Sequence, residues 1–179
     1  MLDSTQAPFP DSHVVGSGPE PHPWLAPAVA LLGRWQGTGT VGYGTMTEDL
    51  TYAQQITFSH DGRPFLHYDA RAWLTDAEGR PVRPSGRETG WWRVMPDGYL
   101  EAVVAHPTGI VTTYVGRING TEIELASRDM AVTPLAKEVT ASRRRLTLDG
   151  DALTVVQELE AVGMPLQQHL SARLRRRPV

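Results

Sequence analysis

His169 is the residue whose type best suits a metal or cofactor site. A neutral imidazole is the commonest metal ligand in proteins, and it can hold a haem iron from one side. The segment 166–174 alternates in character, and His169 falls on its polar face, opposite the leucines at 166, 170 and 174. This alternation alone predicts a solvent-facing histidine, whereas a barrel with a polar-lined cavity could receive the ring inside. The other histidines, such as His60, His67 and His106, form no pair with zinc-ligand spacing.

Lys137 is the second candidate, because it is the only lysine among 17 Lys and Arg residues. Its compact ammonium could pair with an anionic group such as a carboxylate. A single lysine in an arginine-rich chain can equally arise by chance, so the sequence leaves both interpretations open. No Ser/His/Asp nucleophile signature of the type G-x-S-x-G is present.

Residues 37–42 match the G-x-G-x-x-G pattern of dinucleotide-binding proteins. Such a site needs a parallel strand before the glycines and a helix after them, but the residues that follow, 43–47, are poor helix material. We therefore interpret residues 33–39, Gly-Arg-Trp-Gln-Gly-Thr-Gly, as a first strand in which glycines two apart permit bending or close backbone approach. Trp35 could cover one end of a barrel. This segment fits a purely structural strand and a ligand-related role equally well.

The composition excludes several classes of protein. A chain of 179 residues with 40% hydrophobic and 21% charged residues fits one globular domain. Its net charge of −3 gives no support to nucleic-acid binding, and we interpret the arginine clusters 143–145 and 175–177 as solvated. The absence of cysteine excludes disulfides and covalently attached c-type haem. The apolar run 25–32 is too short to span a bilayer, and no Lys or Arg precedes it to form a signal peptide, so we expect a cytoplasmic protein that does not insert into membranes.

Alternation with period two dominates from residue 33 onward and predicts half-buried strands, for example at 65–74, 153–161 and 166–175. Hairpin signals such as Asn119-Gly120 and Asp149-Gly150 separate the strands. These patterns predict an all-β fold of about ten antiparallel strands in up-and-down order, after a short helical turn within 24–32. Closure into a barrel would remove the exposed edges and could enclose one small ligand.

Residues 1–23 differ from the rest of the chain, because they contain five prolines and no apolar periodicity. Such a segment cannot bury enough apolar surface to offset the entropy lost on ordering. We expect a flexible tail over 1–23 and a single barrel domain over 24–179.

Taken together, the motifs resemble those of the nitrobindin family, small ten-stranded barrels of the lipocalin and fatty-acid-binding-protein type. The opening motif of that family, G-x-W-x-G-x-G, is met by Gly33, Trp35, Gly37 and Gly39. Further matching stretches are residues 58–64, 88–93, 105–111, 136–139 and 165–170. The resemblance covers residues 24 to 177. One departure is the glycine-rich segment 39–45, where a helix–turn–helix lid or a short loop is expected to begin.

The resemblance implies a ferric protein with one non-covalently bound haem b, which binds nitric oxide and isomerises peroxynitrite to nitrate. The axial iron ligand of the family corresponds to His169, and a lysine that contacts the haem corresponds to Lys137. No catalytic group beyond the iron is implied, and a homodimer is left open. The alternative is a non-enzymatic carrier of a fatty acid or another small apolar ligand, which would have no need of His169.

Overall fold

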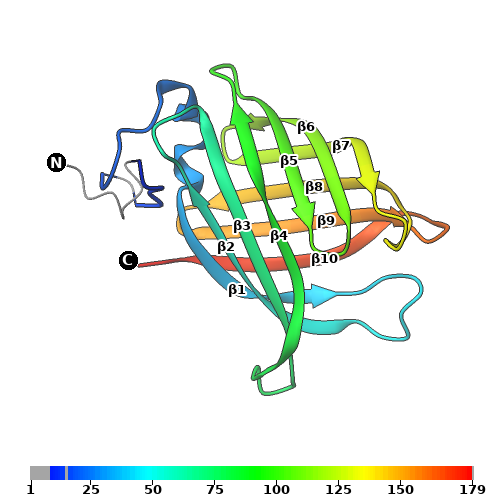
Figure 1. Cartoon of the computed structure of the whole chain (residues 1–179). Helices are drawn as coiled ribbons and strands as arrows, with labels where there is room; N and C mark the ends of the chain where they lie inside the picture. The colour runs from blue at the N-terminus through cyan, green and yellow to red at the C-terminus, as the bar shows by residue number, and fades with distance from the viewer. Residues whose placement is uncertain (1–8, 15, 179) are drawn as a thin grey trace.

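The computed structural model describes residues 9–14 and 16–178, which form a closed antiparallel β-barrel (Figure 1). One 3-10 helix, η1 (Pro23–Leu31), precedes the barrel. The ten strands are β1 (Gly33–Val41), β2 (Leu50–Ser59), β3 (Phe65–Thr75), β4 (Pro81–Val94), β5 (Tyr99–His106), β6 (Ile110–Asn119), β7 (Glu122–Val132), β8 (Val139–Asp149), β9 (Ala152–Ala161) and β10 (Met164–Arg177). Consecutive strands are neighbours, and β1 also pairs with β10, which closes the barrel. The expected ten-stranded barrel and the short helical turn before it are confirmed.

The strand connections lie alternately at two ends of the barrel. The helix end carries η1 and the connections 60–64, 95–98, 120–121 and 150–151, whereas the far end carries the connections 42–49, 76–80, 107–109, 133–138 and 162–163. In Figure 1, η1 lies to the left and the β9–β10 turn lies to the right. Gly120 and Gly150 have φ values of 60° and 57°, which glycine adopts without strain. The two predicted hairpin turns are thereby confirmed.

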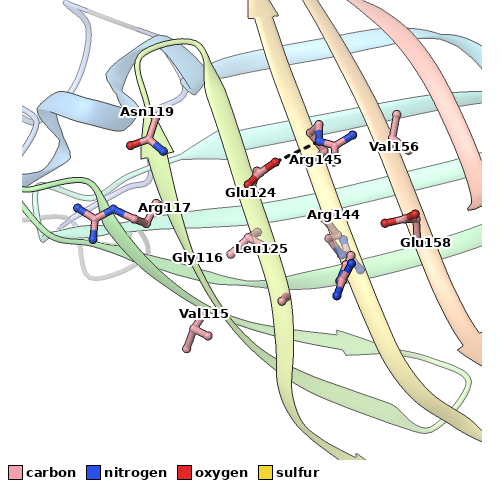
Figure 2. A pocket seen from close by; sticks show the side chains of 12 residues that line it. Val115, Gly116, Arg117, Asn119, Glu124, Leu125, Arg144, Arg145, Val156 and Glu158 are labelled. Carbon is pink, nitrogen blue, oxygen red and sulfur yellow. Dashed lines mark hydrogen bonds and ion pairs between the residues drawn. The ribbon is translucent and has the colours of Figure 1, made fainter. Parts of the chain in front are cut away.

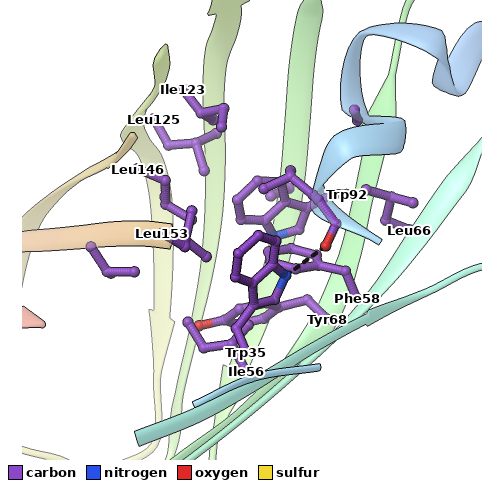
Figure 3. Close-up of a cluster of buried hydrophobic side chains, with 14 of the residues drawn as sticks. Trp35, Ile56, Phe58, Leu66, Tyr68, Trp92, Ile123, Leu125, Leu146 and Leu153 are labelled. Atoms are coloured by element: carbon purple, nitrogen blue, oxygen red, sulfur yellow. Dashed lines mark hydrogen bonds between the residues drawn. The ribbon is translucent and has the colours of Figure 1, made fainter. Parts of the chain in front are cut away.

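Trp35 fills the helix end of the barrel. Its indole is fully buried, and Nε1 donates a hydrogen bond of 2.8 Å to the carbonyl of Leu31 in η1. The guanidinium of Arg176 lies 4.1 Å from the indole centre. Aromatic and aliphatic side chains from many strands pack around it (Figure 3): Ile56, Phe58, Leu66, Tyr68, Trp92, Ile123, Leu125, Leu146 and Leu153. The prediction that Trp35 covers one end of the barrel is confirmed.

β1 and β10 approach each other closely at Gly37 and Gly39. A Cβ atom on Gly37 would collide with the carbonyl oxygen of Arg173, and a Cβ atom on Gly39 would collide with that of Ser171. These two glycines are therefore required by space, as the sequence interpretation of a close backbone approach proposed. β1 is followed by the short loop 42–49, which contains no helix, and by an antiparallel strand. This arrangement rules out a dinucleotide-binding turn at the G-x-G-x-x-G match.

Part of the N-terminal segment contacts the barrel. The backbone of Ser12 exchanges two hydrogen bonds, of 2.7 and 2.8 Å, with His60. Ser59 also donates a hydrogen bond of 3.4 Å to the carboxylate of Asp11. These contacts anchor residues 11 and 12 to the barrel. Residues 1–8 and 15 lie outside the described part of the chain. A flexible tail over 1–23 and a domain that begins at residue 24 therefore remain predictions.

Arg144 corrects the interpretation of the cluster 143–145 as solvated. Arg143 and Arg145 are exposed, but Arg144 is buried. The reason is the alternation of β8, in which Ser142 and Leu146 are buried on the same face as Arg144.

Among the residues that the structure describes, no helix is long and apolar enough to cross a membrane.

Candidate functional site

His169 lies at the far end of the barrel, in an irregular part of β10. The pairing with β9 shifts register between Gln168 and Leu170, so His169 is the extra residue of a β-bulge. Its backbone carbonyl accepts a hydrogen bond of 2.9 Å from the N–H of Gly42, and its Nδ1 lies 3.1 Å from the carbonyl oxygen of Gly42. Bulges redirect side chains at barrel rims. The solvent-facing position that alternation predicts is therefore wrong, and the side chain is half-buried.

The surroundings keep the imidazole of His169 neutral. Burial lowers its pKa below the ordinary value of 6.5, although the hydrogen bond to Gly42 and the charge of Glu88 oppose this shift. In the neutral ring, Nδ1–H donates to the Gly42 carbonyl, and Nε2 then carries the free lone pair. Metal-ligating histidines commonly donate their other ring N–H to a backbone carbonyl in this way. The geometry therefore presents Nε2 as a ligand atom.

Half-buried apolar side chains surround the same region of the interior. Val41 pairs with Leu170 between β1 and β10, and both pack with Leu74 of β3 against the edge of the core. Tyr52 Oη and Gln54 Oε1, both on β2, are buried and have no hydrogen-bond partner among the described residues. Residues 9–14 and 16–178 also contain no group of three or more side chains that could hold a metal ion. An apolar wall with few polar atoms and a single histidine suits a largely apolar cofactor that brings its own metal.

Lys137 lies in the loop 133–138, which joins β7 to β8 at the same end of the barrel as His169. Its side chain is exposed. The pairing of β7 with β8 stops at Ala126 and Arg143, although β7 continues to Val132. The two strands are therefore not paired beside this loop. The structure brings both predicted ligand residues to one end and puts Lys137 at its solvent edge, where an ammonium can meet a carboxylate.

A polar network occupies the middle of the barrel. Arg144 Nη1 and Tyr68 Oη both donate to Glu88 Oε2, at 2.6 and 2.9 Å. Arg144 Nε also donates to Tyr114 Oη at 3.1 Å. On the other side of the carboxylate, Nδ1 of His106 lies 3.7 Å from Glu88 Oε1. An ion pair with several hydrogen bonds therefore stands between the apolar helix end and the far end.

The charges of this network follow from its contacts. Burial would raise the pKa of Glu88, but the charge of Arg144, the charge that His106 carries when it is protonated, and the hydrogen bonds from Arg144 and Tyr68 outweigh it, so the pKa is lowered and the carboxylate is ionised. Burial lowers the pKa of His106, which is therefore neutral at pH 7. The sequence did not predict that Glu88, Arg144 and His106 form a group. The signal was present for Arg144, which alternates with Ser142 and Leu146 on a predicted strand.

One surface hollow does not coincide with the predicted ligand residues. It has a volume of about 380 Å³ and is lined by residues of β6 to β9, including Arg117, Glu124 and Arg145 (Figure 2). The second hollow, of about 280 Å³, lies at the far end and is lined by Thr40, Gly42, Tyr43, Gly44, Asp49, Gln167, Gln168 and His169. Its position beside the histidine, rather than its size, marks it as part of the candidate site.

The residues at the far end fit the haem that the motifs imply. His169 offers a neutral imidazole with a free Nε2, half-buried apolar side chains lie at this end of the interior, and Lys137 stands at the exposed edge. The residues of the motif G-x-W-x-G-x-G, by contrast, do not all lie with His169 at the far end of the barrel. Its tryptophan, Trp35, is at the helix end, and its glycines serve the contact between β1 and β10.

Known proteins resemble this chain over nearly its whole length. The model of a family described as a THAP4-like, heme-binding beta-barrel domain matches residues 24–176. A peroxynitrite isomerase of Streptomyces griseus is 58% identical over 172 residues, which cover 96% of this chain and 93% of that protein. A peroxynitrite isomerase of Salinispora tropica is 47% identical over 172 residues, which cover 93% and 87% of the two chains.

A solved structure agrees with these relatives. The crystal structure of Rv2717c from M. tuberculosis superimposes with a TM-score of 0.79 at 38% identity and covers 89% of this chain and 100% of that chain. The resemblance to nitrobindins inferred from the motifs is confirmed. Because the family model spans the barrel from η1 to β10, the chain belongs to the THAP4-like, haem-binding β-barrel family.

Proposed function

We propose that this chain binds one haem b non-covalently and isomerises peroxynitrite to nitrate, with nitric oxide as a further small ligand. His169 is the axial ligand of the iron, and Lys137 pairs with a haem propionate. The haem-binding family and the two relatives named peroxynitrite isomerase support this reaction.

The observation that carries the assignment is the contact of 3.1 Å between Nδ1 of His169 and the carbonyl oxygen of Gly42. It fixes the ring in an orientation that leaves Nε2 free. Because burial lowers the pKa of His169, iron binding at neutral pH does not have to displace a proton from the ring.

When bound, ferric haem would supply a Lewis-acidic iron for the conversion of peroxynitrite to nitrate, and His169 and Lys137 would hold the group. The chain contributes binding and orientation. His169 anchors the iron, the apolar side chains of Val41, Leu74 and Leu170 keep water from its surroundings, and Lys137 orients a propionate. The conversion of the peroxynitrite anion to nitrate moves no proton overall, so it requires no side chain to act as a general base.

A titration of the apoprotein with ferric haem tests the role of His169. The wild-type chain should give a Soret band that saturates at one haem per chain. His169→Ala should lose at least about tenfold in affinity and change the Soret position, because the axial bond is removed. The matched control is His67→Ala, which removes a partly exposed histidine from the outer face of β3 and should bind haem like the wild type. An unchanged spectrum and affinity in His169→Ala would refute the assignment.

Lys137→Ala should have a much smaller effect. An exposed ion pair contributes about 0.2–1 kcal/mol, which corresponds to a few-fold loss of affinity at most. The loss should shrink as salt is raised, and the Soret position should not change. The control is Arg83→Ala, which removes one exposed charge at the same end of the barrel. Complete loss of haem binding in Lys137→Ala would contradict the propionate pair.

The same titration separates the proposed function from the carrier alternative. A carrier of fatty acids would take up a fluorescent fatty acid in the wild type and in His169→Ala alike, without a saturable Soret complex. A homodimer, nitric oxide binding and a cytoplasmic location remain predictions.

A further inference from the structure

We propose that Tyr43 is a positioning residue for His169. Its hydroxyl fastens the loop after β1 to the end of β9, and this attachment holds the carbonyl of Gly42 against Nδ1 of the histidine. The proposal rests on the proposed role of His169 as the iron ligand, but its structural part can be tested without haem.

The hydroxyl of Tyr43 is held by the backbone of β9. It accepts a hydrogen bond of 2.8 Å from the N–H of Ala161, and it lies within donating distance of two carbonyl oxygens, 3.1 Å from that of Ala161 and 3.2 Å from that of Leu159. The hydroxyl therefore accepts one hydrogen bond and shares its single proton between two acceptors, so its donor and acceptor groups are both used. This side chain therefore joins two segments that are 118 residues apart in sequence.

The ring of Tyr43 also contacts the histidine directly. The two ring centres are 5.7 Å apart and the planes are inclined by 85°, which is an edge-to-face arrangement. The adjacent Gly42 makes two hydrogen bonds with His169, one from its N–H and one through its carbonyl. Tyr43 and Gly42 thus constrain the imidazole through its ring and through Nδ1.

The glycines on both sides of Tyr43 lie close to the side chains of Asp49 and Met164. A Cβ atom on Gly42 would collide with the carboxylate of Asp49, and one on Gly44 would lie 2.5 Å from Cε of Met164. We call residues 42–44 the Gly-Tyr-Gly strap. The strap is the first part of the loop 42–49 and lies against Asp49 of the same loop and Met164 of β10. The backbone N–H of Gly42 bonds to β10, and the hydroxyl of Tyr43 bonds to β9, so two sets of hydrogen bonds fix the strap.

Removal of the hydroxyl should therefore release the strap from β9 while the aromatic ring remains. The Gly42 carbonyl would then be positioned only by the backbone hydrogen bond between the Gly42 N–H and the His169 carbonyl. A carbonyl held less firmly selects the Nδ1–H tautomer less strongly, so the proton of the neutral imidazole can move to Nε2, because the two tautomers are similar in energy when no partner selects one. A ring with its proton on Nε2 has to change tautomer before that nitrogen can bind iron. The strap would thus prepare the histidine for its ligand.

The test uses the apoprotein with ¹⁵N-labelled histidine and long-range ¹H–¹⁵N NMR at about pH 8, above the ordinary pKa of histidine. In the wild type, His169 should be predominantly the Nδ1–H tautomer. In Tyr43→Phe the spectrum should shift toward a mixture of tautomers, and the amide of Ala161 should exchange faster with solvent. Tyr99→Phe, which removes a hydroxyl at the helix end, is the matched control and should change neither observable.

Haem release completes the test. Transfer of haem from the holoprotein to an excess of apomyoglobin should be faster in Tyr43→Phe, by up to about tenfold. Loss of a direct partner of a metal ligand typically costs about 10–100-fold, and the hydroxyl of Tyr43 acts on His169 only through the direct partner Gly42. An unchanged tautomer in Tyr43→Phe would overturn the proposal, whatever the haem data show. If the tautomer changes but His169→Ala binds haem normally, the strap is correct and the assignment of the iron ligand fails.

Discussion

Replacement of Glu88 by Gln isolates the buried ion pair at the centre of the barrel. The side chain of Arg144 is only 6% exposed, and that of Glu88 is 16% exposed, so water can replace little of the lost interaction. The glutamine amide could still accept hydrogen bonds from Tyr68 and Arg144, but it carries no charge. The substitution therefore leaves the guanidinium of Arg144 buried without a counter-ion.

The expected loss of stability is large because one partner of a buried pair is removed. Such changes typically cost about 3–5 kcal/mol. For a chain of this size, about 2–4 °C of melting temperature corresponds to 1 kcal/mol, so the decrease should be about 6–20 °C. The neighbouring pair of Arg145 and Glu124 supplies the control, since its side chains are 58% and 68% exposed. Glu124→Gln should cost about 0–1 kcal/mol.

Urea unfolding of the apoprotein, followed by tryptophan fluorescence, measures both changes. A double variant, Glu88→Leu with Arg144→Met, should be less destabilised than Glu88→Gln, because it removes both charges from the interior. The reasoning would be refuted if Glu88→Gln lost less than about 1 kcal/mol. It would also be refuted if the double variant lost the sum of the losses of Glu88→Leu and Arg144→Met measured singly, since contacting residues should not be additive.

Three further predictions concern the apoprotein. The free energy of unfolding should be constant above about pH 6.5 and should fall below that pH. The reason is that His106 and His169 become protonated in the unfolded chain, whereas burial lowers the pKa of both in the folded state. Unfolding at a series of pH values should show this dependence, and His106→Gln should make the dependence weaker. Gly37→Ala should lower the melting temperature, because its Cβ would collide with the carbonyl of Arg173, and a value within about 2 °C of wild type would contradict the space argument. A chain that starts at Trp24 should lose only a few degrees. The truncation removes the two backbone hydrogen bonds of Ser12 with His60 and the one from Leu25 to His22, which each contribute about 0.5–1.5 kcal/mol and are offset by the ordering entropy of the segment. A much larger loss would show that the segment is part of the domain.

The barrel could be predicted because its signals are local. Alternation with period two identifies strands, and turns such as Asn119-Gly120 limit the connections to hairpins. A chain of consecutive hairpins leaves few topologies besides an up-and-down sheet, and closure follows from the need to remove its edges. The close approach at Gly37 could also be predicted, because two glycines on one face of a strand indicate a bend or a close approach of another backbone.

The orientation of His169 could not be predicted in the same way. Alternation assumes regular pairing, whereas β10 has register shifts on both sides of Gln167 and Gln168. A bulge depends on how two distant strands meet, and no local pattern in residues 166–174 announces it. The resemblance of motifs identified the residue, but only the structure shows which ring nitrogen is held by Gly42 and which is free.

Arg144 and Tyr43 illustrate two different reasons for omission. Arg144 alternates with Ser142 and Leu146, but its charge led to the interpretation of the cluster as solvated, because the partner carboxylate of Glu88 is 56 residues away in sequence. For Tyr43 no pattern was available, since its role depends on backbone atoms of β9. Long-range polar contacts of both kinds become visible only when the barrel has closed.

The barrel has an apolar core at the helix end, a polar network in the middle and the candidate site at the far end. This order explains how a stable fold can have an accessible site. Trp35 and its neighbours are buried at the helix end beside η1, and this burial contributes to the hydrophobic stabilisation. The pair of Glu88 and Arg144 satisfies its own charges and hydrogen bonds in the middle, so the apolar core does not have to extend to the far end. The residues around His169 can then remain half-buried, as a ligand that enters and leaves requires, at little cost to the stability of the whole. Substitutions at Tyr43 should accordingly alter the ligand site more than the unfolding free energy, whereas substitutions at Trp35 should do the reverse.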